Sequence, residues 1–255
     1  MDIIVCLKQV PDLQQIRIKH ETREPVLEGA PFIFGAFEKN ALEEAVRLKE
    51  KHGGKVIALA LGNAKLKDTI IEALAMGADE AVMLTDAAFA RGGSASVAQA
   101  LAAAIRKIGK FDLILMGEGS ADNYSGQVIG RVAEWLDLPQ ITYVRELSVE
   151  GNRLRATRDL EDALEVVEAE LPVIISATSE LNTPRLPPLP AILKAARKPM
   201  KSLSPADLGI GAQAAVVQTL SNLAPEQARK QVLFEGEADK AVDELVKALQ
   251  KEGAL

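Results

Sequence analysis

Residues 113–130, LILMGEGSADNYSGQVIG, decide the fold of this chain. An apolar run leads into Gly117 and Gly119, short polar side chains follow, and a helical pattern begins near Gln127. That order predicts a buried strand, a turn of small residues and a helix N-terminus. Free amides at a helix start hold phosphate groups well. The stretch therefore predicts a nucleotide site, although a plain strand-to-helix turn fits the same pattern.

Composition indicates an ordinary globular protein. The chain has 255 residues, a hydrophobic fraction of 48% and a formal net charge of −6. The acidic balance argues against nucleic-acid binding. The apolar runs have the length of strands, so no transmembrane segment is expected, and the first residues do not resemble a signal peptide. The single cysteine, Cys6, excludes an internal disulfide. We expect a cytoplasmic protein.

Around the central stretch, buried apolar runs alternate with amphipathic segments. Strands are predicted at residues 2–8, 55–61, 80–84, 111–116 and 173–177, and helices at residues 37–52, 66–76, 94–108 and 128–136. A short exposed hairpin is expected at residues 16–27, and antiparallel strands at residues 141–149, 153–160 and 163–169. The expected class is α/β, with a doubly wound, mostly parallel sheet and an antiparallel extension.

The ends of three predicted strands should meet. Ligands of doubly wound sheets bind beyond the carboxyl ends of the strands, where the strand order reverses. Residues 8–12, 62–63 and 117–127 are therefore expected to converge on one cleft.

The sequence offers little for catalysis. His20 and His52 lack partner residues, and Cys6 is expected to be a small core side chain rather than a nucleophile, with a ligand contact near the strand end as the alternative. No metal-ligand cluster is expected either. Residues 92–96, GGSAS, faintly resemble a phosphate loop, but a helix start capped by Ser94 is the preferred interpretation.

The chain changes character after Asn182. Six prolines occur between Pro184 and Pro205, with a short helix expected at residues 191–197. Residues 202–223 show little periodicity, and terminal helices are expected at residues 225–233 and 239–250. We expect a nucleotide-binding domain at 1–182 and a loop with a C-terminal arm at 183–255. The arm is either a flexible tail or a segment that embraces a partner.

Several ordered segments resemble the β subunit of electron transfer flavoproteins. They are IVCLKQVPD, FEKNALEEAVRLKE, ALAMGADEAVML, LILMGEGSADNYSGQVIGRVAEWLDLPQ and LPVIISATSELNTPRLPPLPAILKAARKPM. The resemblance covers residues 1 to about 201 and implies a fold like that of the adenine nucleotide α-hydrolases.

The resemblance implies an electron carrier and a set of partners. An α subunit would complete a heterodimer and share an FAD with this chain, and the C-terminal arm would wrap that subunit. Electrons would pass from a dehydrogenase, or from NADH in electron-bifurcating members, to a quinone oxidoreductase or a ferredoxin. Flavins perform the redox chemistry, so no catalytic acid or base is expected in this chain.

The resemblance also implies site residues. Those for the nucleotide are Cys6, Leu7, Lys8, Asp12, Asn40, Gly62, Asn63, Gly117, Ser120, Asp122, Asn123, Tyr124, Ser125, Gly126, Gln127 and Val128. Those for partners are Glu165, near the mobile flavin domain of the α subunit, and the dehydrogenase anchor of Leu189, Pro190, Ile192 and Leu193.

The second nucleotide is left open between AMP and FAD. The small Gly126 leaves room for an isoalloxazine ring, which slightly favours FAD, whereas the bulk of Tyr124 opposes it. The rival interpretation is a stress or sensor module of the same fold that binds ATP or AMP without a redox role. The arm after Asn182 argues against that rival.

Overall fold

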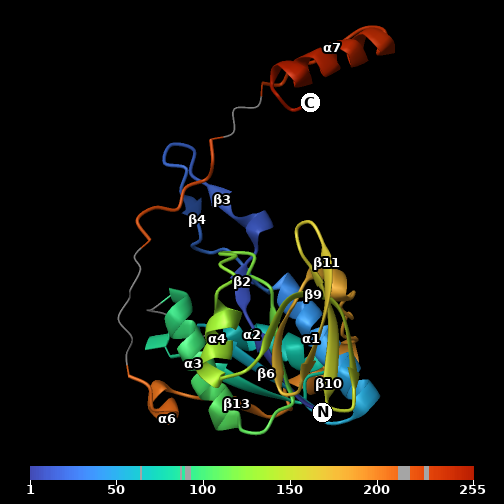
Figure 1. Cartoon of the computed structure of the whole chain (residues 1–255). Helices are drawn as coiled ribbons and strands as arrows, with labels where there is room; N and C mark the ends of the chain where they lie inside the picture. The colour runs from blue at the N-terminus through green and yellow to red at the C-terminus, as the bar shows by residue number, and fades with distance from the viewer. Residues whose placement is uncertain (64, 87, 90–92, 212–218, 227–229) are drawn as a thin grey trace. The chain divides into compact units, whose positions relative to one another are not determined.

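The computed structural model describes residues 1–63, 65–86, 88–89, 93–211, 219–226 and 230–255. These residues form two compact units (Figure 1). The first comprises Met1–Arg17 and Val26–Ser221, and the second comprises Ile18–Pro25 and Asn222–Leu255. Every residue of the site described below belongs to the first unit.

A nine-stranded sheet forms the centre of the first unit, in the order β11-β10-β9-β12-β8-β1-β6-β7-β13. Its strands are β1 (Asp2–Leu7), β6 (Lys55–Leu61), β7 (Glu80–Leu84), β8 (Leu113–Gly117), β9 (Gln140–Glu150), β10 (Arg153–Asp159), β11 (Leu164–Glu170), β12 (Val173–Ala177) and β13 (Met200–Ser202). Neighbouring strands run parallel from β9 to β13, whereas β10 pairs antiparallel with both β9 and β11. The predicted α/β fold with an antiparallel extension is confirmed.

The central strands are apolar because helices cover both of their faces. On one face, Ile3 and Val5 of β1 join a core with α1 (Ala36–His52) and α2 (Leu66–Met76). On the other face, Ile4 and Cys6 join a core with α3 (Gly93–Ile108) and α4 (Val128–Leu136). The alternation along β1 therefore places Cys6 on the face that α3 and α4 cover.

The strand order reverses between β1 and β8. From β1 the chain moves outward through β6 to β7, and it then returns to β8 on the opposite side of β1. From β8 the chain continues through β9, β10 and β11 at the far edge, and it returns with β12 between β8 and β9. The carboxyl ends of β1 and β8 therefore diverge into loops on opposite sides, which opens a crevice between them.

Several short elements were not expected from the sequence. β2 (Gln9–Pro11), just beyond the strand expected at residues 2–8, pairs with β5 (Phe32–Phe34). β13 extends the main sheet beside β7, and α6 (Pro205–Leu208) has a capping box made by Ser204 and Asp207. These elements are too short for periodicity to reveal them.

The Pro-rich segment and the C-terminal segment match the expectations only in part. The helix expected at residues 191–197 is α5 (Leu189–Ala195), and the η3 turn (Ser179–Leu181) precedes it. The helix expected at residues 225–233 is wrong for residues 225–226 and 230–233, which have no helical structure, and residues 227–229 lie outside the described residues. Residues 202–223, which show little periodicity in the sequence, include residues 212–218, and those seven lie outside the described residues.

The second unit contains the turn of the expected exposed hairpin and the last helix. β3 (Arg17–Ile18) and β4 (Pro25–Val26) form the hairpin, which follows the η1 turn (Leu13–Gln15). The helix expected at residues 239–250 is α7 (Ala238–Lys251), which buries none of its residues. No helix in the described part of the chain is long and apolar enough to cross a membrane.

Candidate functional site

A cavity of about 240 Å³ opens at the carboxyl ends of β1 and β8. Its lining residues come from several distant segments of the first unit: Cys6, Leu7, Lys8, Glu38, Leu61, Gly93, Ser94, Val97, Leu101, Met116, Gly117, Glu118, Gly119, Ser120, Asn123, Ser125, Gly126, Val128 and Ile129. The cavity lies where the strand order reverses, which is the place where doubly wound sheets bind ligands.

The loop after β8 needs its glycines for steric reasons. A Cβ at Gly117 would lie 2.8 Å from the Cβ of Phe37, and a Cβ at Gly119 would lie 2.8 Å from the Tyr124 ring. Gly126 has a φ of +63°, a conformation that glycine adopts without strain. The loop therefore packs directly against α1 while its other side lines the cavity.

Tyr124 lies outside the described lining of the cavity. Its ring packs edge-to-face on Phe37, with the ring centroids 5.8 Å apart. Its hydroxyl donates to a carboxylate oxygen of Glu118. That hydrogen bond raises the pKa of Tyr124 to about 12, so the phenol stays protonated at neutral pH. The side chain closes over Gly119 rather than filling the cavity.

A lysine stands beside the loop. Lys8 Nζ donates to Ser120 Oγ at 3.0 Å and to Asp122 Oδ1 at 2.6 Å. Burial opposes ionisation of Asp122, but the hydrogen bond and charge of Lys8 outweigh it and hold the pKa of Asp122 below its ordinary value. The Lys8 side chain remains 41% exposed beside the loop.

Two helix N-termini meet at the cavity. α3 begins at Gly93 and α4 at Val128, with Gln127 as the residue before α4. Ser94 Oγ donates to Gln127 Oε1 at 3.0 Å, which ties the two helix starts together. The first amides of a helix have no partner inside the helix and carry partial positive charge. This end of the cavity therefore favours an anion such as a phosphate.

A buried carboxyl group lies in the cavity wall. Glu38, in the first turn of α1, is 5% exposed, and its Oε2 has no hydrogen-bond partner among the described residues. Burial raises the pKa of Glu38 to about 7, although its own backbone N–H and Lys8 lower it. A Cβ at Gly35 would lie 2.0 Å from that oxygen, so the carboxyl group occupies space left free by this glycine.

Comparison with known proteins agrees with this geometry. The family model described as electron transfer flavoprotein domain matches residues 26–208. The chain is 40% identical over 255 residues to the electron transfer flavoprotein subunit beta of Thermoanaerobacterium thermosaccharolyticum, covering 98% of each chain. It is 35% identical over 258 residues to the Bacillus subtilis protein of the same name, covering all of both chains.

The chain belongs to the electron transfer flavoprotein β-subunit family. The resemblance seen in the sequence is therefore confirmed. A further relative is the Caffeyl-CoA reductase-Etf complex subunit CarD of Acetobacterium woodii, 36% identical over 215 residues, which cover 84% of this chain and 82% of that protein.

Most of the nucleotide-site residues expected for this family come together. Those lining the cavity are Cys6, Leu7, Lys8, Gly117, Ser120, Asn123, Ser125, Gly126 and Val128. Asp122 and Gln127 contact lining residues through Lys8 and Ser94. Burial raises the pKa of the Cys6 thiol to about 12, in keeping with a wall residue rather than a nucleophile.

Other expected residues lie elsewhere. Asp12 caps the η1 turn by accepting from the Gln14 backbone, Gly62 donates to Leu84 O, and Asn63 accepts from the Lys65 backbone. Asn40 donates to the backbone oxygen of Asn182 at 2.6 Å. None of these four lies in the described lining. The expected convergence of three strand ends thus holds for Lys8 and for the loop after β8, whereas β6 contributes Leu61 instead.

Sequence reasoning missed Glu38, Glu118 and the start of α3. Glu38 lies at the start of the helix expected at residues 37–52, and no local signal in the sequence marks it as buried. The sequence signal at the start of α3 is the faint resemblance of residues 92–96 to a phosphate loop, and two of these residues, Gly93 and Ser94, line the cavity. The expected Ser94 cap is wrong because the helix already begins at Gly93, and Gly92 lies outside the described residues.

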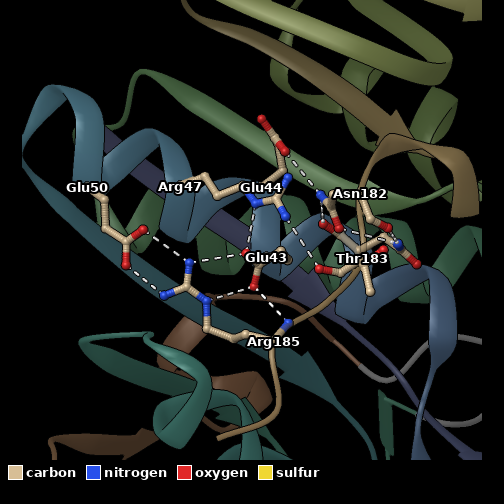
Figure 2. Close-up of polar contacts among 8 residues, drawn as sticks. Glu43, Glu44, Arg47, Glu50, Asn182, Thr183 and Arg185 are labelled. Atoms are coloured by element: carbon tan, nitrogen blue, oxygen red, sulfur yellow. Dashed lines mark hydrogen bonds and ion pairs between the residues drawn. The ribbon is translucent and has the colours of Figure 1, made fainter.

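A second network holds the segment after β12 onto α1 (Figure 2). Arg185 donates to Glu43 Oε2 at 2.8 Å and to Glu50 Oε1 at 2.6 Å. Asn182 donates to Glu44 Oε2 at 3.0 Å, and Arg47 donates to Glu43 Oε1 at 2.8 Å. We call these residues of α1 and residues 182–185 the clasp.

Charge pairing stabilises the clasp despite its burial. The Glu43 side chain is 4% exposed. Burial opposes its ionisation, but hydrogen bonds from Arg185 and Arg47 outweigh that effect and keep the pKa of Glu43 below its ordinary value. Those charge-assisted hydrogen bonds fix the backbone at position 185. The clasp therefore fixes the point at which the Pro-rich segment leaves the core.

Beyond the clasp, the expected partner-binding residues are exposed. Leu189, Ile192 and Leu193 of α5 are 67%, 40% and 69% exposed, and Pro190 is exposed as well. Glu165 lies on β11 and pairs with Arg158 at 2.5 Å. Exposed apolar side chains gathered on one short helix fit the hypothesis of a protein-binding surface.

Proposed function

We propose that the chain is the β subunit of a heterodimeric electron transfer flavoprotein and that its cavity binds an adenine nucleotide. The observation that carries the proposal is the cavity itself, where a glycine-rich loop, two helix N-termini and Lys8 surround the carboxyl ends of β1 and β8. Membership of the family supports the redox role.

The donors around the cavity suit a nucleotide. The start of α4, with Ser125 and Gly126, and the start of α3, with Ser94, would hold the phosphate groups. Lys8 would add a positive charge, and Asp122 would accept from ribose hydroxyls. The apolar side chains of Val97, Leu101 and Ile129 would pack on a ring and exclude water from it.

Of the two nucleotides, the geometry favours FAD as the second cofactor. The objection to FAD was the bulk of Tyr124, and that side chain lies outside the described cavity lining. Gly126 adds little bulk beside it. A flavin supplies the electron-transfer chemistry when bound, while this chain supplies binding, orientation and local electrostatics. A second FAD in this chain would imply, through the family resemblance, NADH as an electron donor and electron bifurcation as the activity.

The partners follow from the two exposed surfaces. The α subunit would share the other FAD with this chain and would be contacted by Glu165 and by the C-terminal arm. A dehydrogenase would dock on Leu189, Pro190, Ile192 and Leu193, because exposed apolar anchors often dominate binding energy. A quinone oxidoreductase or a ferredoxin would receive the electrons. CarD, a relative named as part of a reductase complex, supports such a docking role.

Co-purification tests the proposal directly. The full-length chain is expressed together with an α subunit, and the heterodimer is examined by visible spectroscopy and by extraction of its nucleotides. We expect a yellow heterodimer with two FAD molecules, one of which is lost or weakened when Gly126 is replaced by Phe. One FAD and one AMP per heterodimer would favour the AMP type. A colourless chain carrying ATP would point to the sensor module instead.

A further inference from the structure

The unexplained group in the cavity is the carboxyl group of Glu38. It comes from α1 rather than from the glycine-rich loop, and only 5% of the residue is exposed to solvent. Its Oε2 lacks a hydrogen-bond partner among the described residues, yet the residue lines the cavity. A buried polar atom without a partner is costly unless something else satisfies it. Its position in the wall of the cavity makes a bound ligand the candidate partner.

The charged groups that face Glu38 influence its protonation state in opposite directions. Lys8 at the end of β1 favours the ionised form, and Asp122 in the loop after β8 opposes it. Lys8 is already paired with Asp122 at 2.6 Å, so much of its charge is compensated. The other titratable groups of the described lining are Cys6 on β1 and Glu118 after β8. Neither would supply a positive charge to an ionised Glu38.

A bound nucleotide would further favour the protonated form of Glu38 over the ionised form. Its phosphate groups bring negative charge into the same cavity, and its body covers the remaining access of water to the carboxyl group. Both effects disfavour a carboxylate. A protonated carboxyl group, in contrast, can donate a hydrogen bond to a nitrogen or oxygen atom of the ligand.

We propose that Glu38 binds the nucleotide as a neutral acid, so that the ligand and one proton bind to the cavity together. This inference rests on the proposed nucleotide site and adds a regulatory property to it. Nucleotide occupancy then falls as the pH rises, and Glu38 is the group that senses the change. Gly35 makes the arrangement possible, since any side chain at position 35 would displace the Oε2 atom.

The test is calorimetric titration of the full-length heterodimer, freed of the nucleotide bound in this cavity, with AMP and with FAD. The pH range 7.5–8.5 is chosen because the second ionisation of a phosphate, with a pKa near 6, is complete there. We expect the wild-type affinity to fall about tenfold per pH unit, as one-proton linkage requires. Titrations in two buffers of different ionisation enthalpy should show uptake of about one proton, and this measurement needs no variant.

Two matched variants assign the proton to a residue. Glu38→Gln keeps the size of the side chain and a donor group, and it should bind with an affinity independent of pH. Glu118→Gln removes the other carboxyl group of the described lining, one that already accepts from Tyr124, and it should keep the wild-type slope. Circular dichroism checks that both variants fold.

The outcomes separate the inference from the proposed function. Binding of AMP or FAD without a pH slope, or a slope lost in Glu118→Gln and kept in Glu38→Gln, would overturn the inference while leaving the nucleotide site intact. Failure of both nucleotides to bind at any pH would overturn the nucleotide site and the inference together.

Discussion

Glu38 shows how one residue couples the helix that carries it to the cavity. Its side chain folds back over Gly35 in the first turn of α1, where a larger residue would collide with it. Gly35 in turn donates to Lys8 O at 3.1 Å, which ties the start of α1 to the end of β1. The position of this carboxyl group is therefore fixed by backbone contacts rather than by a charged partner.

Replacing Glu38 by Gln should stabilise the free protein at pH 8. Because the folded-state pKa of Glu38 is raised to about 7, the folded chain retains a proton that the unfolded chain releases above its ordinary pKa of 4.5. Wild-type stability therefore falls as the pH rises from about 4.5 to about 7, and it stays lower above that range. The variant should gain about 1 to 3 kcal/mol in urea unfolding at pH 8, and little at pH 4. An equal difference at both pH values would contradict this account.

At the scale of elements, α1 organises two features at once. Its first turn places Glu38 in the cavity, and its middle and last turns provide the clasp that holds residues 182–185 (Figure 2). The loop after β8 packs on the same helix through Gly117 and Tyr124. Consequently α1 fixes the position of both the cavity wall and the segment that leads to the exposed α5.

The clasp should contribute measurably to stability. In Arg185→Ala, the buried carboxylate of Glu43 would keep only Arg47 as its charged partner among the described residues. Breaking a buried ion pair is costly, so we expect a loss of about 2 kcal/mol in urea unfolding. Arg155→Ala is the control, because Arg155 meets Glu168 at 3.4 Å with both side chains exposed. That control should lose less than about 0.5 kcal/mol. Equal losses in the two variants would refute the role given to the clasp.

The close approach of the loop to α1 makes its first glycine sensitive. In Gly117→Ala, the added Cβ would lie 2.8 Å from Phe37 Cβ and 3.3 Å from the Glu38 backbone nitrogen. Overpacking of this kind costs about 1 to 3 kcal/mol, and we also expect weaker nucleotide binding because the loop must move. Gly211→Ala is the matched control, since no atom of the described residues lies within 4 Å of its added Cβ. Thermal unfolding that does not distinguish the two variants would contradict the prediction.

For the whole molecule, the sheet and the cavity belong to the first unit, whereas α7 belongs to the second. The apolar side chains Val242, Leu245 and Val246 of α7 are exposed and follow helical spacing. A helix with one apolar face and no buried residue has the composition of a partner-binding element. This division predicts separate roles for the two units.

A chain that ends at Ser221 tests that division. We expect it to fold and to bind nucleotide with unchanged affinity, because every described residue of the cavity lining is retained. Co-purification of the α subunit should fall sharply, since the proposed arm is missing. Loss of nucleotide binding together with loss of the sheet's cooperative unfolding would show that residues 222–255 are needed for the fold of the first unit.

The sequence alone determined the parallel sheet, its antiparallel extension and the glycine-rich turn between β8 and α4. Apolar runs such as that of β8, and glycines such as Gly117, act within a few residues of chain, so local patterns reveal them. The tertiary structure decided which side chains meet. Glu38, Ser94 and Lys8 come from three distant segments, and only the strand order brings them to one cavity. Burial of a carboxyl group and the turning of Tyr124 away from that cavity depend on packing across the whole unit, which no local pattern encodes.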